Sequence, residues 1–225
     1  EDAYGNKIVV PAGFKIVSNS DTNNATTVDK GIVIEDATTG ATAGSQFVWI
    51  PVGKIYTDVA KTDANAKTIE LGRYSFDYST GLESAYSGSY VEEDANDEST
   101  LTNTENKAIA KNITNFKNSV AANGGYYIGR YEARTTTART AADDALTQIT
   151  EEGTGQVYNF VTQLQAAQLA QNMYNSNKFT SDLMNSYAWD TATLFLQTCG
   201  TNEKYSRQNS VNTTLLQTGT NTQET

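Results

Sequence analysis

The side chains that most clearly permit chemistry are the acidic ones in the stretch VEEDANDEST. Glu92, Glu93, Asp94 and Asp97 lie close together there, and carboxylate oxygens are the ligands that Ca²⁺ prefers in proteins. The stretch lacks the glycine and the fixed ligand spacing of an EF-hand loop, and runs of like charge commonly form solvated loops. Two readings follow: a calcium site at these four residues, or a surface loop with no metal and no cofactor.

Cys199 is the one candidate for cysteine chemistry. The chain has a single cysteine and no histidine, which removes the commonest general base and metal ligand. Activation of the thiol would depend on a nearby Lys, Asp or Glu. Its position at the end of a helical pattern favours packing in the core, the usual environment of a free cysteine.

Two adjacent acidic pairs are candidates for general acid–base chemistry. Asp143 and Asp144 form one pair, and Glu151 and Glu152 form the other. Glycoside hydrolysis uses two carboxylates that converge in space, so sequence spacing neither supports nor excludes it. The chain contains no Walker loop, GxGxxG, GxSxG or CxxC pattern. The sequence therefore assigns no catalytic or cofactor-binding residue, and a non-catalytic role is favoured over an enzymatic one.

The stretch GGYYIGRYEART, residues 124–135, combines aromatic and charged side chains in a strand-like pattern. Because side chains alternate along a strand, Tyr126, Arg130 and Glu132 share one face. We interpret the stretch as a central core strand in which Tyr126, Arg130 and Glu132 are structural, with Arg130 and Glu132 available for an ion pair. The alternative is that it forms a ligand-binding surface.

Trp189 and Asp190 lie in the middle of the helical stretch SYAWDTATLFL. An indole N–H or a carboxylate in such a position commonly ties a helix to a neighbouring loop, because buried polar groups need hydrogen-bond partners. We therefore predict structural roles for both residues.

Strands are predicted for the N-terminal part of the chain and helices for the remainder. The runs KIVV, FKIV, GIVIED and QFVWIPV are strand-sized, rich in branched or aromatic residues and separated by turn residues, which predicts antiparallel strands. Apolar spacing predicts a helix over 102–123, a second from about Asn159 with Phe160 on its buried stripe, and a third from near Ser181 with Leu183 and Met184 on its buried face.

The order of these elements predicts one α+β domain with mixed antiparallel sheets and about three helices. Residues 1–53 would form a β-strand region, residues 54–101 an irregular acidic insertion, and residues 102–225 the helix and strand part of the same domain. The formal net charge of -10 argues against nucleic-acid partners, and no apolar run approaches the roughly 18 residues of a membrane span.

Five stretches, taken in order, resemble the formylglycine-generating enzyme (sulfatase-modifying factor) family in its bacterial relatives. They are VVPAGFKIV, SQFVWIPVG, GGYYIGRYEAR, VTQLQAAQLAQNMY and SDLMNSYAWDTATLFLQ. The resemblance implies a C-type-lectin-like fold. The family's catalytic cysteine pair belongs to a C-terminal part with no counterpart in this chain, and Cys199 matches neither cysteine. The resemblance therefore implies no catalytic residue in this chain.

The same resemblance implies a location and a set of partners. Similar bacterial domains follow a pilin-like helix or are ligand-binding proteins diversified by retroelements, which implies an extracellular or cell-surface protein of bacterial or phage-associated origin. The expected function is ligand recognition, adhesion or display, with a protein or glycan partner or self-association into a surface filament. The alternative is a fragment of an oxidase of the formylglycine-generating type that acts on a sulfatase cysteine.

Overall fold

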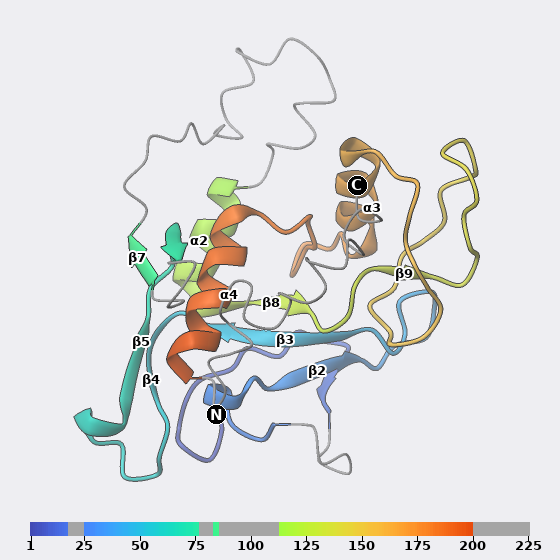
Figure 1. Ribbon diagram of the computed structural model, residues 1–225. Coiled ribbons are helices and arrows are strands. Elements are labelled where there is room, and N and C mark those ends of the chain that lie inside the picture. The colour runs from blue at the N-terminus through green and yellow to red at the C-terminus, as the bar shows by residue number, and fades with distance from the viewer. Residues whose placement is uncertain (18–24, 77–82, 86–112, 200–225) are drawn as a thin grey trace, which may run out of the picture.

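A four-stranded antiparallel sheet lies at the centre of the molecule (Figure 1). The computed structural model describes residues 1–17, 25–76, 83–85 and 113–199. The sheet has the order β1 (Phe14–Ile16), β2 (Val33–Asp36), β3 (Gln46–Pro51) and β8 (Gly125–Gly129). These are four of the predicted strands, and their antiparallel pairing is confirmed.

The predicted strand KIVV is wrong. Residues 7–10 have no strand structure, yet Ile8 and Val9 still pack against the core. The carbonyl of Val9 accepts a 2.8 Å hydrogen bond from the Tyr127 hydroxyl. The apolar run is therefore partly buried without forming a strand, and the Val9 carbonyl is paired with a side chain instead of a neighbouring strand.

β8 is an edge strand of this sheet, so the central position expected for it is also wrong. Its sequence is apolar on both faces because both faces are covered. Tyr126 faces helix α4 (Ser186–Cys199), while Tyr127 packs on Trp49 with ring centroids 4.9 Å apart. A helix therefore covers one face, and on the other face Tyr127 is partly buried beside its cross-strand neighbour Trp49.

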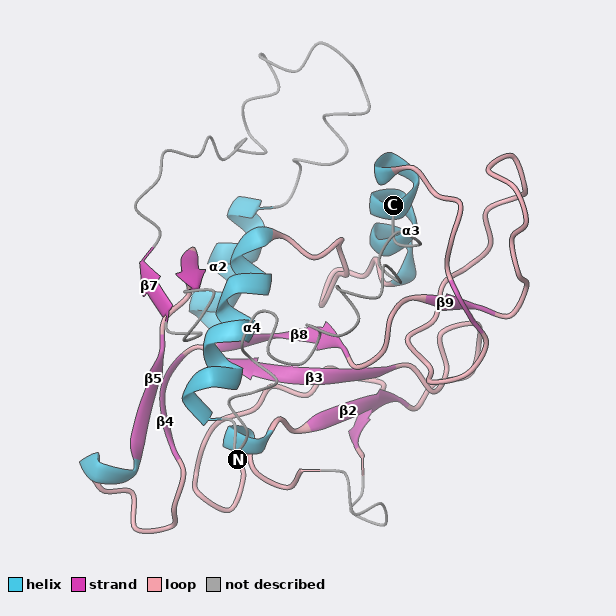
Figure 2. Ribbon diagram, viewed as in Figure 1, coloured by secondary structure: helices cyan, strands magenta, loops and turns pink. Residues whose placement is uncertain are grey.

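Helices α2 (Ile113–Asn123) and α4 lie over the same part of the sheet (Figure 2). Lys117 of α2 places its Nζ 4.0 Å from the centre of the Tyr187 ring of α4. α2 ends at Gly124, whose φ of 75° is in the left-handed region that favours glycine. The predicted end of the helix at residue 123 is confirmed, whereas residues 102–112 of that prediction lie outside the described residues.

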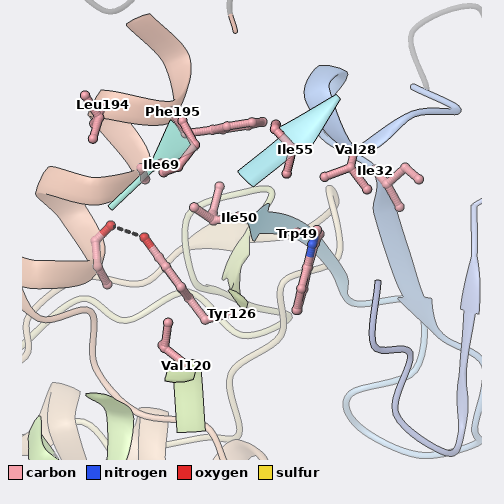
Figure 3. Packing of buried hydrophobic residues seen from close by; sticks show 12 residues of the cluster. Val28, Ile32, Trp49, Ile50, Ile55, Ile69, Val120, Tyr126, Leu194 and Phe195 are labelled. Carbon is pink, nitrogen blue, oxygen red and sulfur yellow. Dashed lines mark hydrogen bonds between the residues drawn. The ribbon is translucent and has the colours of Figure 1, made fainter. Parts of the chain in front are cut away.

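The main core lies between these helices, the sheet and the short 3-10 helix η1 (Val28–Lys30). It contains buried side chains from every one of these elements (Figure 3), including Val28, Trp49, Ile50, Val120, Tyr126 and Phe195. Burial of apolar surface of this kind is the dominant favourable term in folding.

A β-hairpin extends from the sheet and contributes to the core. β4 (Gly53–Tyr56) pairs with β5 (Ala66–Ile69), with the 3-10 helix η2 (Asp63–Asn65) between them. Ile55 and Ile69 are buried against α4. The beginning of the segment 54–101 is therefore regular, which corrects the irregular insertion that the sequence predicts there. Farther along, β6 (Tyr74–Phe76) pairs with β7 (Glu83–Ala85).

Helix α3 (Gln163–Met173) starts later than the predicted Asn159. Thr162 caps it, and Gln165 returns the hydrogen bond in a capping box. Phe160 lies outside the helix and is half exposed, with a φ of 52°. The other end of α3 is docked on the sheet, since the Tyr174 hydroxyl donates a 2.8 Å hydrogen bond to Asp36.

A small two-stranded unit completes the described structure. β9 (Arg134–Thr135) pairs with β10 (Gln156–Val157) beyond the end of β8. In the part of the chain with described placement there are three α-helices together with antiparallel sheets, so the α+β class is confirmed. No helix among those residues is long and apolar enough to cross a bilayer.

The first residues of the chain are fixed to the body of the domain. Asp2 accepts hydrogen bonds from the backbone of Asn6 and of Val28, at 2.8 and 2.7 Å. Asn6 is buried and pairs with the backbone of Tyr56 in β4, donating to its carbonyl at 2.8 Å and accepting from its N–H at 2.7 Å. This side chain therefore acts as one more hydrogen-bonding partner along the edge of β4.

Candidate functional site

An open hollow of about 470 Å³ lies at the N-terminal end of α4. Its lining comes from α4, from the loop before α4 and from the segment between β5 and β6. The lining residues are Arg73, Met184, Asn185, Ser186, Trp189 and Asp190.

Trp189 is the most exposed large side chain of this hollow. It is 64% exposed, whereas the other tryptophan, Trp49, is 2% exposed. Met184, 42% exposed, lies in the same lining. The structural role predicted for Trp189 is wrong, because its indole faces solvent and does not tie the helix to a loop. Leu183 and Met184 are exposed as well, because α4 begins at Ser186 and leaves them outside the helix.

Asp190 fixes one wall of the hollow. Its Oδ2 accepts a 2.7 Å hydrogen bond from Arg73 Nε and a 3.0 Å hydrogen bond from the backbone N–H of Tyr74. The next residue, Thr191, accepts a 3.2 Å hydrogen bond from the backbone N–H of Gly72. Asp190 therefore ties α4 to a distant loop. The charges of Arg73 and Asp190 compensate each other at the surface of the hollow.

Asn185 forms the rim where α4 starts. Its Oδ1 accepts a 3.0 Å hydrogen bond from the backbone N–H of Ala188, as a helix N-cap does. The described structure contains no hydrogen bond at Asn185 Nδ2, at Ser186 Oγ or at Asp190 Oδ1. The hollow thus combines an indole and a thioether with a donor, a hydroxyl and an acceptor.

A second, smaller hollow of about 250 Å³ lies between α3 and the loop around Thr147. Its lining is aliphatic and amide-bearing: Leu146, Thr147, Gln148, Gln168, Leu169 and Asn172. It has neither an aromatic surface nor a charged group, so it offers less for specific recognition.

Glu151 is the most perturbed carboxyl group of the described structure. Burial raises its pKa to about 7, and the positive charge of Arg134 only partly opposes this. The carboxyl lies against Gly129, whose missing side chain makes the space for it. Glu151 Oε2 is buried and has no hydrogen-bond partner. Glu151 Oε2 is closed to solvent, so a substrate does not reach that atom.

The acidic pairs do not converge as catalytic pairs. Glu152 is exposed, and its carboxyl lies near Gly44, whereas the carboxyl of Glu151 lies near Gly129. Asp144 accepts hydrogen bonds from the backbone of Thr140 and Ala141, which lower its pKa, and it closes a local turn. Asp143 is exposed.

Cys199 is half buried at the end of α4 and packs against the core. Burial, together with the negative charge of Asp29, raises the pKa of its thiol to about 11. The reactive thiolate is therefore scarce near neutral pH.

Arg130 forms part of a polar ladder across the sheet. Its Nη1 donates to Gln46 at 2.8 Å, Gln46 donates to Glu35 at 2.9 Å, and Lys15 lies 3.0 Å from Glu35. Among the ion pairs of the described residues none joins Arg130 with Glu132, which is exposed. The expected pair is replaced by a link to Gln46 on the neighbouring strand β3.

Metal binding has no candidate in the part of the chain that the structure describes, where no three His, Cys, Asp or Glu side chains lie together. The calcium candidates Glu92, Glu93, Asp94 and Asp97 lie outside the described residues.

Comparison of the chain with protein-family models, with curated proteins and with solved structures found no match. The resemblance to the formylglycine-generating enzyme family therefore stays a prediction from the sequence.

Sequence reasoning missed Arg73, Met184 and Asn185 as members of one site. A signal for the exposure of Trp189 was present. On a helical wheel Trp189 shares its face with Thr193 and Leu196, whereas Ala188, Ala192 and Phe195 lie on another. Arg73 joins the hollow only through its long-range contact with Asp190, which leaves no local trace in the sequence.

Proposed function

We propose that the protein is a non-catalytic recognition module of the extracellular space or the cell surface, with a C-type-lectin-like fold. Its ligand is a protein or a glycan, bound at the hollow beside Trp189. The observation that carries this proposal is the exposed indole, 64% accessible, at a hollow whose wall is fixed by the pair between Arg73 and Asp190.

An exposed tryptophan on a rigid element is a typical binding residue. Tryptophan and arginine are enriched where binding energy is concentrated, because a large flat side chain contributes contact area at little cost in conformational entropy. Trp189 projects from a helix that is anchored on the sheet, so its backbone is held in place before the ligand arrives.

A catalytic role has less support from the described groups. The Cys199 thiol has a raised pKa, and the single strongly perturbed carboxyl group among them, Glu151, is half buried and does not line the hollow. This arrangement supports binding over the alternative of an oxidase of the formylglycine-generating type.

The composition supports an extracellular location. The surface is polar without being rich in lysine, with 16 Lys and Arg residues in a chain of 225. The net charge of -10 keeps such a protein soluble and disfavours binding to nucleic acid.

Binding of the fluorescently labelled chain to intact bacterial and animal cells tests the proposal. We expect saturable binding that Trp189→Ala abolishes and that Leu196→Ala, an exposed change on the same helix, leaves intact. Equal binding of the wild type and the Trp189→Ala variant to every cell type would remove the proposed site.

Self-association is a second candidate, favoured by the position of β1 at the edge of the sheet. An edge strand can pair with another chain. Light scattering and electron microscopy of the purified chain test it, and uniform monomers at high concentration would exclude a filament built by this protein alone.

A further inference from the structure

We propose that the hollow beside Trp189 binds one neutral sugar ring of a glycan, with the indole stacked against the apolar face of the ring. This inference rests on the proposed function and narrows its ligand from a protein or a glycan to an uncharged carbohydrate.

The shape and the apolar surface of the hollow suit a ring. A pyranose presents a flat face of C–H groups, and the flat face of an indole is the side chain that matches it in size and polarity. Met184 supplies a second apolar surface in the lining, with a flexible chain that adapts to the ring. The hollow is shallow and open to solvent, so a ring would lie against the indole at the surface and a longer glycan would continue outward.

The polar groups of the hollow suit hydroxyls. A hydroxyl donates one hydrogen bond and accepts others, so it needs both kinds of partner. Asp190 Oδ1 is an acceptor and Asn185 Nδ2 is a donor, while Ser186 Oγ serves as either. None of these three atoms has a recorded partner in the described structure, so a ring hydroxyl takes a hydrogen bond at each without displacing an existing one.

The charge balance selects a neutral ligand. The guanidinium of Arg73 and the carboxylate of Asp190 lie 2.7 Å apart and compensate each other. An anionic sugar would meet the Asp190 carboxylate together with a chain whose net charge is -10, and both repel it. An uncharged polyhydroxyl ring does not meet this repulsion.

The test uses the whole chain and the methyl glycosides of glucose, galactose, mannose, N-acetylglucosamine and N-acetylgalactosamine. Each is titrated to about 50 mM, so that a dissociation constant as weak as about 1 mM would still give saturation. Intrinsic fluorescence reports binding at Trp189, and a Trp49→Phe variant assigns the signal to that residue. We expect at least one glycoside to change the Trp189 emission saturably, and Trp189→Ala to weaken its binding, followed by calorimetry, about tenfold or more.

Two further variants make the result specific. Trp189→Tyr retains an aromatic face and should keep most of the affinity, whereas Leu196→Ala should keep all of it. Failure of every glycoside to bind, or binding that survives Trp189→Ala, overturns the inference. Cell binding that requires Trp189 but is removed by protease and not by glycosidases would also overturn it, while leaving the proposed function in place.

Discussion

The Tyr126 hydroxyl donates a 2.6 Å hydrogen bond to the backbone carbonyl of Ala188. This bond joins the edge strand β8 to helix α4 at the residue that precedes Trp189 (Figure 3). The strand with the most conspicuous pattern in the sequence therefore holds the helix that presents the candidate site.

Replacing Tyr126 with Phe should destabilise the protein by about 1 to 2 kcal/mol, because it removes a buried hydrogen bond and leaves the Ala188 carbonyl with one partner fewer. Urea unfolding followed by circular dichroism measures this. Tyr4→Phe is a matched control, since no described group is recorded as a partner of the Tyr4 hydroxyl. Equal midpoints for both variants would contradict the structural role of the bond.

The stability of the protein should fall as the pH rises from about 4.5 to about 7. In the folded chain burial raises the pKa of Glu151 from 4.5 to about 7, so the folded state keeps a proton that the unfolded state releases in this range. Stability is therefore greatest below the unfolded pKa and is lost through the folded pKa. The loss should amount to about 2 kcal/mol, which allows for partial hydration of the carboxylate.

Glu151→Gln should abolish this component of the pH dependence and be more stable than the wild type at pH about 8. Glu152→Gln, which changes the exposed neighbour, should follow the wild-type curve. Thermal or urea unfolding across the pH range measures both variants. A Glu151→Gln curve that runs parallel to the wild type would contradict the assignment.

Gly129→Ala should destabilise the protein by about 2 kcal/mol through overpacking. A Cβ at this position would lie 2.7 Å from Glu151 Cδ and would contact Glu151 Oε2. Adding Glu151→Ala should recover part of the loss, so the two changes should be non-additive in a double-mutant cycle. Strict additivity would show that Gly129 is needed for another reason, such as the close approach of an added Cβ to the Tyr131 carbonyl oxygen, at 3.0 Å.

Asp190→Asn should cost about 2 kcal/mol, because it removes the negative charge from a partly buried, hydrogen-bonded ion pair with Arg73. The pair of Lys54 and Asp63 provides a control with similar geometry, at 2.9 Å, but with an exposed carboxylate. Asp63→Asn should have no measurable effect on stability. Chemical denaturation of both variants separates the two environments, and equal effects would argue against burial as the cause.

Local patterns were sufficient to predict most elements of the fold. The strands at Phe14, Val33 and Gln46 and the stop at Gly124 follow from alternation and turn chemistry. What failed depends on distant parts of the chain. The edge position of β8 depends on which distant strands pair with it, and the apolar run at Ile8 is partly buried without a strand partner.

The candidate site was less predictable than the fold. A hydrogen bond from the helical carboxylate of Asp190 to a neighbouring loop was predicted. Its partner Arg73, 117 residues away in sequence, was not. The exposure of Met184 depends on where α4 begins, which Asn185 decides through its cap. Helix boundaries are set by such single contacts, whereas the apolar period continues through them.

The fastening of the first residues has a mechanical consequence. A force applied at Glu1 would pass through the first few residues to the two hydrogen bonds between Asn6 and the backbone of Tyr56. β4 carries that tension into the hairpin that packs on α4. A tether at Glu1 would therefore set the orientation of the surface that carries Trp189. The resistance of the protein to force in single-molecule pulling would depend on Asn6.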